Sequence, residues 1–74
     1  MIKLTNREEE VYLFILEYKS LYGYAPSIRD IAGGVFCSVG YASRIVKILQ
    51  TKGYINYTPH VPRSIVISNK SIPI

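Results

Sequence analysis

Apolar residues follow a helical period in the first third of the chain. They recur at steps of three and four residues, which is the spacing of one buried helix stripe. Thr5 followed three residues later by Glu8 is the sequence of a capping box, and Gly23 is a common helix stop. We therefore predict a helix over residues 6–22. The residues expected to be buried along it are Val11, Phe14, Ile15, Tyr18, Leu21 and Tyr22.

A second, shorter helix is predicted over residues 28–34. Ser27 can cap its start, and Asp30 three residues later gives a shorter version of the same capping box. Gly33 and Gly34 follow each other, and two glycines cost about 2 kcal/mol against alanine in a helix interior. We expect these glycines to break the helix, so that a tight turn begins with them.

A third helix is predicted over residues 39–52, with Ser38 as its N-cap and Gly53 as its stop. Its apolar positions also recur at three- and four-residue steps, so we expect this side to pack against the first two helices. The residues on the apolar side are Val39, Ala42, Ile45, Val46 and Leu49.

The other side of the third helix is small at its start, then polar, then basic. Gly40, Ser43, Arg44 and Lys47 recur there at helical steps, with Tyr41 beside them. A DNA major groove admits an α-helix, and reading it needs a close approach, hydrogen-bonding groups for base edges and cations for phosphates. This side is therefore a candidate DNA-reading face. A basic helix face that is merely solvated is the alternative, and the pattern alone leaves it open.

Two short β-strands are predicted after the third helix, at residues 54–58 and 63–68, as a hairpin over residues 54–68. The prolines Pro59 and Pro62 lie between the strands and exclude regular structure there. The order helix, helix, tight turn, helix, hairpin is that of a winged helix-turn-helix. The predicted fold is mainly α with a small β-hairpin, a three-helix core plus a wing, in one domain that spans the 74 residues.

Charge is unevenly distributed along the chain, whose formal net charge is +4. Residues 1–30 carry four basic and five acidic side chains, whereas residues 31–74 carry five basic side chains and no acidic one. Such asymmetry indicates that the C-terminal half faces a polyanion. A mildly basic protein without such a partner is the plainer interpretation of composition alone.

The composition argues against several other functions. A single cysteine, Cys37, excludes an internal disulfide and fits a reducing compartment. No apolar run approaches the ~18 residues of a membrane span, and the N-terminus lacks a signal-peptide core, so we expect a cytoplasmic protein. After Asp30 there is no acidic side chain, and Cys37 and the one histidine, His60, fall in a turn and in the wing. We therefore predict no enzyme activity, no cofactor and no metal site.

Three stretches of the chain resemble the N-terminal DNA-binding domain of the LexA repressor family. LTNREEEVYLFILEY is similar to the family's Leu-Thr opening and first helix, and GYAPSIRDIA to its Gly-x-x-Pro-Ser/Thr-x-x-x-Ile-Ala signature. LQTKGYI is similar to the family's Leu-x-x-Lys-Gly-x-Ile. The resemblance covers about residues 4–67. Its matching positions are Gly23, Pro26, Ser27, Ile31, Ala32, Leu49, Lys52, Gly53, Ile55 and, in the hairpin, Arg63.

The resemblance implies a winged helix-turn-helix that binds double-stranded operator DNA and represses transcription. The family's base-reading residues lie near the start of the third helix, and its wing approaches the neighbouring DNA backbone. The positions that correspond to base reading are Ser38, Gly40, Tyr41, Ser43 and Arg44. We further predict that Lys47, Lys52 and Arg63, which flank this face, act mainly on phosphates.

The chain also departs from the family. The turn before Phe36 is one residue shorter than usual, and Gly40 and Tyr41 replace polar residues, so no operator sequence is implied. The family's linker and self-cleaving Ser/Lys domain have no counterpart in these 74 residues, so we do not expect self-cleavage. A stand-alone regulator and a fragment of a longer one are both compatible with this. Without a dedicated dimerisation domain, we expect a monomer or weak homodimer that pairs on a two-fold operator.

A winged-helix module for protein–protein interaction, without a specific DNA site, is the alternative function, because fold alone does not fix function. A surplus of surface tyrosines would favour it. The tyrosines that do not obviously fit in one small core are Tyr12, Tyr22, Tyr24, Tyr54 and Tyr57.

Overall fold

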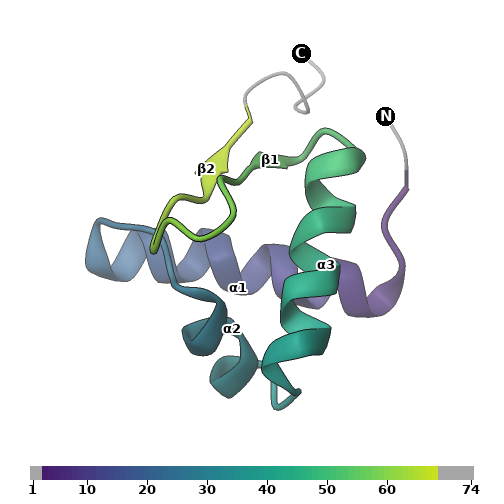
Figure 1. The fold of residues 1–74 in the computed structure, drawn as a ribbon, viewed down its shortest axis with the longest axis horizontal. Coiled ribbons are helices and arrows are strands. Elements are labelled where there is room, and N and C mark those ends of the chain that lie inside the picture. The colour runs from purple at the N-terminus through teal and green to yellow at the C-terminus, as the bar shows by residue number, and fades with distance from the viewer. Residues whose placement is uncertain (1–2, 69–74) are drawn as a thin grey trace.

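Three helices and a short hairpin form residues 3–68, the part of the chain that the computed structural model describes (Figure 1). This arrangement confirms the predicted fold class, mainly α with a β-hairpin wing. The hairpin is a two-stranded antiparallel sheet. In chain order the elements are α1 (Asn6–Tyr22), α2 (Ile28–Gly34), α3 (Val39–Thr51), β1 (Ile55–Asn56) and β2 (Val66–Ile67).

The first two helices begin at the capping boxes that the sequence predicts. The backbone N–H of Glu8 donates to Thr5 Oγ1 at 3.3 Å, and the N–H of Thr5 donates to Glu8 Oε1 at 3.1 Å. The same reciprocal pair joins Ser27 and Asp30 at the start of α2, at 3.1 and 3.0 Å. Each box satisfies backbone N–H groups that the helix leaves without intrahelical partners.

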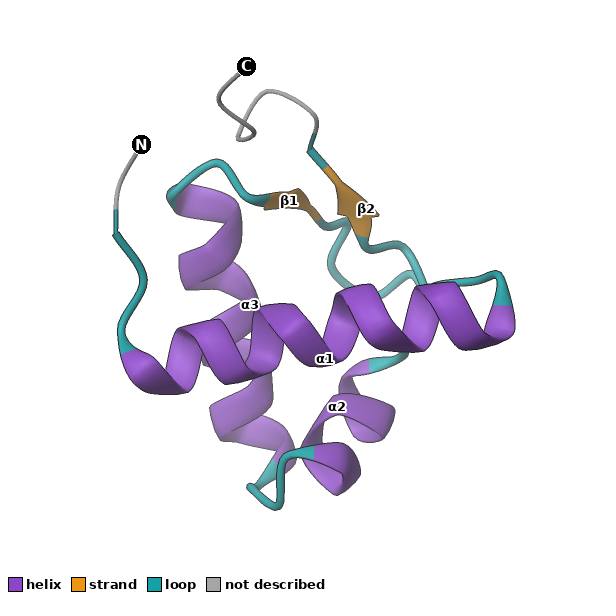
Figure 2. Ribbon diagram, turned by 180° about the vertical axis from the view of Figure 1, so that it is seen from behind, coloured by secondary structure: helices purple, strands orange, loops and turns teal. Residues whose placement is uncertain are grey.

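One apolar core lies where the three helices and the hairpin meet. Helix α1 crosses behind α3, as the two opposite views show (Figures 1 and 2). The buried apolar residues come from every part of the fold. They are Val11, Ile15, Ala25, Ile31, Ala32, Val35, Ala42, Ile45, Val46, Leu49, Ile55 and Ile65.

Three predicted core residues are exposed instead. Val39 is 49% exposed because it is the first residue of α3 and precedes Ala42, where that helix first reaches the core. Leu21 and Tyr22 are 70% and 57% exposed because they lie in the last turn of α1, beyond its buried positions. The helical period marks a continuous stripe, whereas burial extends only as far as the helices overlap.

Helix α2 ends at Gly34, as its predicted bounds have it, but the tight turn begins after the two glycines and not with them. The helix runs through Gly33 and Gly34, and the backbone N–H of Val35 still donates to Ile31 O at 2.9 Å. A Cβ at Gly34 would collide with the ring of Phe14, whereas one at Gly33 would meet open space. Glycine at 34 therefore allows α1 and α2 to approach closely, and neither glycine has a left-handed backbone.

The turn between α2 and α3 changes the chain direction by 108°. This lies within the range of about 90–120° that is typical of a helix-turn-helix. Phe36 has a left-handed φ of 57°, and the N–H of Cys37 donates to Ala32 O at 2.9 Å. The turn is shorter than the family's usual one by sequence, yet it reaches the expected helix angle.

The wing has a shorter ladder than the two predicted strand segments. Its register pairs Ile55 with Ile67 and Asn56 with Val66. Beyond this ladder, the side chain of Ser64 accepts from the N–H of Thr58 and donates to its carbonyl, at 3.0 and 2.8 Å. The side chain of Ser64 thus replaces the next pair of backbone hydrogen bonds of the ladder, and an irregular loop lies beyond it.

The two glycines of α2 should respond in opposite ways to the same substitution. Gly33→Ala should raise the free energy of unfolding by up to about 1 kcal/mol, because alanine is the better helix former and its methyl group meets open space. Gly34→Ala should lower it by about 1–3 kcal/mol, because the new methyl group must displace the Phe14 ring. Urea unfolding of both variants measures this. Equal effects of the two substitutions would contradict the packing role of Gly34.

Candidate nucleic-acid interface

Helix α3 exposes the predicted reading face. Its buried residues point to the core, and the opposite side forms an open groove of about 410 Å³. In Figure 1 this helix lies in front of α1. All residues that line the groove come from α3 and its C-cap, so no other helix contributes to it. The residues that line the groove are Gly40, Ser43, Arg44, Lys47, Ile48, Thr51 and Lys52. The structure thus brings together four of the seven predicted site residues.

Gly40 is not required by the fold. Its backbone is helical without a positive φ, and a Cβ at this position would meet open space. Glycine inside a helix nevertheless costs about 1 kcal/mol against alanine. Neither internal packing nor backbone geometry explains it, so the bare start of α3 fits a close approach from outside the protein.

Two predicted site residues at the start of α3 also have structural contacts. Ser38 is the N-cap, and its Oγ accepts the backbone N–H of Tyr41 at 3.1 Å. The ring of Tyr41 lies 5.7 Å from the guanidinium carbon of Arg7. Both side chains remain exposed and lie beside Gly40, next to the groove. They are therefore accessible to a ligand that lies along α3.

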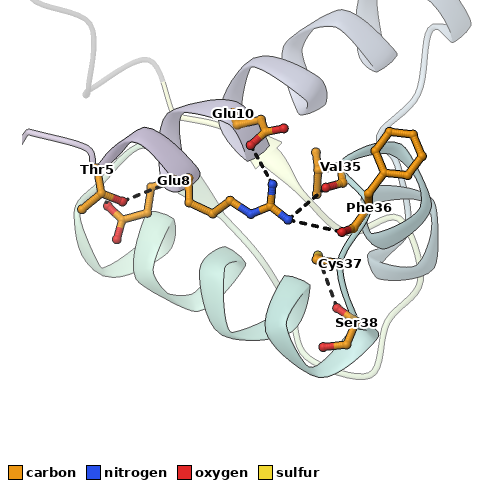
Figure 3. Close-up of polar contacts among 8 residues, drawn as sticks. Thr5, Glu8, Glu10, Val35, Phe36, Cys37 and Ser38 are labelled. Carbon is orange, nitrogen blue, oxygen red and sulfur yellow. Dashed lines mark hydrogen bonds and ion pairs between the residues drawn. The ribbon is translucent and has the colours of Figure 1, made fainter.

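Arg7 of α1 binds the turn from which α3 starts. Its partners Glu10, Val35 and Phe36 are labelled in Figure 3. Its Nη2 donates to the carbonyl of Val35 at 2.9 Å and to that of Phe36 at 3.5 Å. Its Nη1 forms an ion pair with Glu10 at 2.7 Å, which raises the pKa of Arg7. The role of Arg7 at this turn was not predicted from the sequence. Its spacing to Glu10 indicates a local ion pair, but no local pattern indicates a hydrogen bond to a carbonyl 28 residues away.

The two charges on the exposed face of α3 are uncompensated, whereas three other cations of the described residues are paired within the protein. Within residues 3–68, Arg7, Lys52 and Arg63 form ion pairs, whereas the side chains of Arg44 and Lys47 have no protein partner. Helix α3 itself contains no acidic residue. Two free cations therefore lie on one exposed helix face, which is a favourable site for a polyanion.

Lys52 lines the groove, but its ammonium group is bound within the protein. Its Nζ lies 2.6 Å from Glu8 Oε1 and 3.1 Å from the carbonyl of Lys3. This contact joins the end of α3 to the start of α1. Hydrogen bonding from Lys52, with help from the Thr5 N–H, holds the pKa of Glu8 below its usual value.

Arg63 lies in the wing loop, away from the α3 groove, and is likewise engaged. Its Nη1 is 3.1 Å from Asp30 Oδ2. The pKa of Asp30 is lowered, mainly by the hydrogen bond that it accepts from the Ser27 N–H. A second groove, of about 360 Å³, separates the wing from α2. Its lining residues are Pro26, Ser27, Ile28, Arg29, Val39, Tyr57, His60, Val61, Pro62, Arg63, Ser64 and Ile65.

Metal ligands, the cysteine, the histidine and apolar helices are the other features that bear on function, and the described part of the chain places them as follows. Residues 3–68 contain no cluster of three or more histidine, cysteine, aspartate or glutamate side chains that could hold a metal ion. Cys37 is half-buried and donates to the carbonyl of Ser38 at 3.4 Å, while His60 is exposed in the wing loop. No single helix in this range has both the length and the apolar composition of a membrane span.

The tyrosines divide between core edge and surface. Tyr12 and Tyr54 are half-buried and pack edge to face, with ring centroids 5.2 Å apart. Tyr57 is also half-buried against the core. Tyr22 and Tyr24 are exposed, with ring centroids 6.1 Å apart. Two of the five tyrosines in question thus lie on the surface, at the end of α1 and just after it.

Comparison with known proteins gives a consistent family. Residues 1–64 match the family model of the LexA DNA-binding domain. The LexA repressor of Thermosipho africanus is 41% identical over 78 residues, which cover 100% of this chain and 39% of the repressor. LexA repressors of Staphylococcus aureus (strain Newman) and Carboxydothermus hydrogenoformans are 39% and 32% identical over 90% and 95% of this chain. The chain spans about a third of the length of these relatives.

Acid should remove the stabilisation that Glu8 provides through Lys52. Because the folded pKa of Glu8 lies below its unfolded value of about 4.3, its contribution is fully present above that value and is lost as pH falls through the folded pKa. Glu8→Gln should lower the melting temperature at pH 7, and the gap to the unsubstituted protein should close below about pH 4. Thermal unfolding between pH 7 and pH 3 measures the gap.

Glu9→Gln is the matched control for this titration. Glu9 is exposed next to Glu8 and, within residues 3–68, has no ion pair. We expect its substitution to change the melting temperature little at either pH. A Glu8→Gln gap of the same size at pH 3 and pH 7 would show that the pair contributes through packing and not through charge.

Proposed function

Because the chain belongs to the LexA DNA-binding domain family, we propose that it binds double-stranded DNA sequence-specifically and acts as a LexA-like transcriptional repressor. The observation that carries the proposal is the exposed face of α3, where Arg44 and Lys47 line an open groove and have no partner among residues 3–68. A major groove accepts such a helix. The proposal concerns DNA binding and repression, and does not include self-cleavage.

Base reading is proposed for the N-terminal half of α3. Arg44 lies within the first two turns, on the same side as Gly40 and Ser43, and its guanidinium is free to form two hydrogen bonds with a guanine edge. Ser43 can donate or accept a hydrogen bond. Ser38 and Tyr41, exposed at the helix start, are further candidates for contacts to the same DNA segment.

Phosphate binding is proposed for Lys47. It lies one turn beyond Ser43 and Arg44, and a lysine ammonium acts as a point charge, suited to backbone phosphate more than to bidentate base recognition. Lys52 and Arg63 were predicted to act in the same way. Both already have carboxylate partners, so a phosphate would have to compete with Glu8 or Asp30 for them.

Substitutions of Arg44 and Lys47 should separate specific from general DNA binding. On an operator selected from random duplexes, Arg44→Ala should cost about 1–3 kcal/mol, and much less on random DNA. Lys47→Ala should weaken both kinds of DNA about equally and reduce the salt slope by roughly one unit. Affinities on both DNAs at several salt concentrations measure these effects.

Lys19→Ala is the control, because it removes a cation from α1, outside the proposed interface. If Arg44→Ala weakens both DNAs equally, Arg44 is a phosphate contact, and base reading falls to Ser43, Tyr41 or Ser38. If the unsubstituted protein shows no salt-dependent DNA binding, the α3 face is merely solvated. The protein-interaction function, with the exposed Tyr22 and Tyr24, would then replace the proposal.

Dimer formation is proposed to depend on DNA. Helix-turn-helix proteins usually read two half-sites about one helical turn apart. We expect a monomer or weak dimer in sedimentation experiments at micromolar concentration, and two copies on a two-fold operator. A dimer that persists at nanomolar concentration without DNA would contradict this expectation.

A further inference from the structure

Arg63 extends from the wing to three other segments of the protein. Its Nη1 donates to the carbonyl of Ala25 at 3.0 Å and to the hydroxyl of Tyr18 at 3.3 Å, and lies 3.1 Å from Asp30 Oδ2. Its guanidinium carbon is 4.8 Å from the ring centroid of Tyr24. One side chain thus joins the wing loop to α1, to the segment before α2 and to α2 itself.

The carboxylate of Asp30 has two functions at once. The same oxygen, Oδ2, accepts the Ser27 N–H that caps α2 and the hydroxyl of Tyr18 at 3.2 Å, and pairs with Arg63. The start of the helix-turn-helix and the wing therefore share one acceptor. Displacing Arg63 from it would leave an anion without its cationic partner.

The wing needs such a contact because its own hydrogen bonds are few. The ladder contains two residue pairs, and an isolated two-stranded hairpin is at best marginally stable. Ile55 and Ile65 anchor the base of the wing in the core. Farther along the loop, Arg63 itself has a left-handed φ of 56°, a backbone that side chains disfavour and that surrounding contacts must maintain.

We propose that Arg63 is a positioning residue for the wing: through Tyr18 and Asp30 it fixes the wing loop relative to α1 and α2, and it does not bind DNA phosphate. The inference rests on the proposed function, in which wing and α3 meet the same duplex. It also changes the role that the sequence predicts for Arg63. A pre-positioned wing favours binding because less conformational freedom is lost when the complex forms.

Asp30→Asn distinguishes the two roles by the sign of its effect. Asparagine keeps an oxygen for the α2 cap but removes the charge that holds Arg63. If Arg63 positions the wing, Asp30→Asn should weaken operator binding at least about threefold. If Arg63 instead binds phosphate, removing the competing carboxylate should strengthen binding.

The double variant Asp30→Asn/Arg63→Met has the same net charge as the unsubstituted protein, so its salt slope can be compared directly. We expect it to bind about as weakly as Asp30→Asn alone, with the unsubstituted salt slope, because both changes break one contact. Loss of a phosphate contact would lower the slope by about 0.9 unit. Tighter binding by Asp30→Asn, or that lower slope in the double variant, would overturn the proposal.

Hydrogen exchange of the free protein tests the same contact without DNA. Amides between residues 57 and 65 should exchange faster in Asp30→Asn and in the double variant, while those of α3 stay unchanged. If Asp30→Asn folds poorly, Tyr18→Phe replaces it in the experiment, because this variant keeps both charges and the cap. It should show the same faster exchange of the wing amides in smaller degree. Unchanged wing exchange in all variants would overturn the proposal. Absence of DNA binding by the unsubstituted protein would instead remove the proposed function and leave the exchange result to decide the contact.

Discussion

Phe36 has a left-handed backbone between α2 and α3, and the hydrogen bonds of Arg7 to the carbonyls of Val35 and Phe36 hold that turn against α1. These contacts fix the short connection at which the chain turns by 108°, and the buried side chains of Ile31, Ala32 and Val35 pack the end of α2 into the core that it shares with α3. The ring of Phe36 is 90% exposed, so burial does not compensate for its strained backbone. The orientation of α3, and with it the exposure of the groove, depends on the hydrogen bonds of Arg7 to these carbonyls together with the buried side chain of Val35.

Helix positions could be predicted because their signals are local. Thr5 with Glu8, and Ser27 with Asp30, lie within one helical turn of each other, and the hydrogen bonds they form need no tertiary structure. Burial could be predicted less well, since it depends on where helices cross. Val39 continues an apolar stripe that the core does not reach. Gly34 allows α1 to approach α2, because the ring of Phe14 occupies the space that a side chain at 34 would need.

In the candidate site, too, features with local signals could be predicted and features that depend on tertiary contacts could not. The exposed α3 face follows from the period of its own residues, so the sequence locates Gly40, Ser43, Arg44 and Lys47 on one side. Three other cations have contacts to distant segments, and no local pattern indicates those contacts. Arg7 reaches the turn 28 residues away, Lys52 pairs with a carboxylate 44 residues away, and Arg63 contacts α1 across 45 residues.

The three ion pairs have a consequence for the encounter with a polyanion. They neutralise Arg7, Lys52 and Arg63 in place. Among the charges of residues 3–68 that form no ion pair, Glu9 and Glu17 on α1 outnumber the one cation there, Lys19. Because the unpaired charges of α1 are net negative and those of α3 are positive, we expect the charge distribution of the domain to be polarised from α1 toward α3. A duplex would orient a domain polarised in this way before any contact forms, so that collisions with the α3 face lead to docking more often than chance allows. Salt would then slow association by weakening this alignment, in addition to weakening the phosphate contacts of the complex.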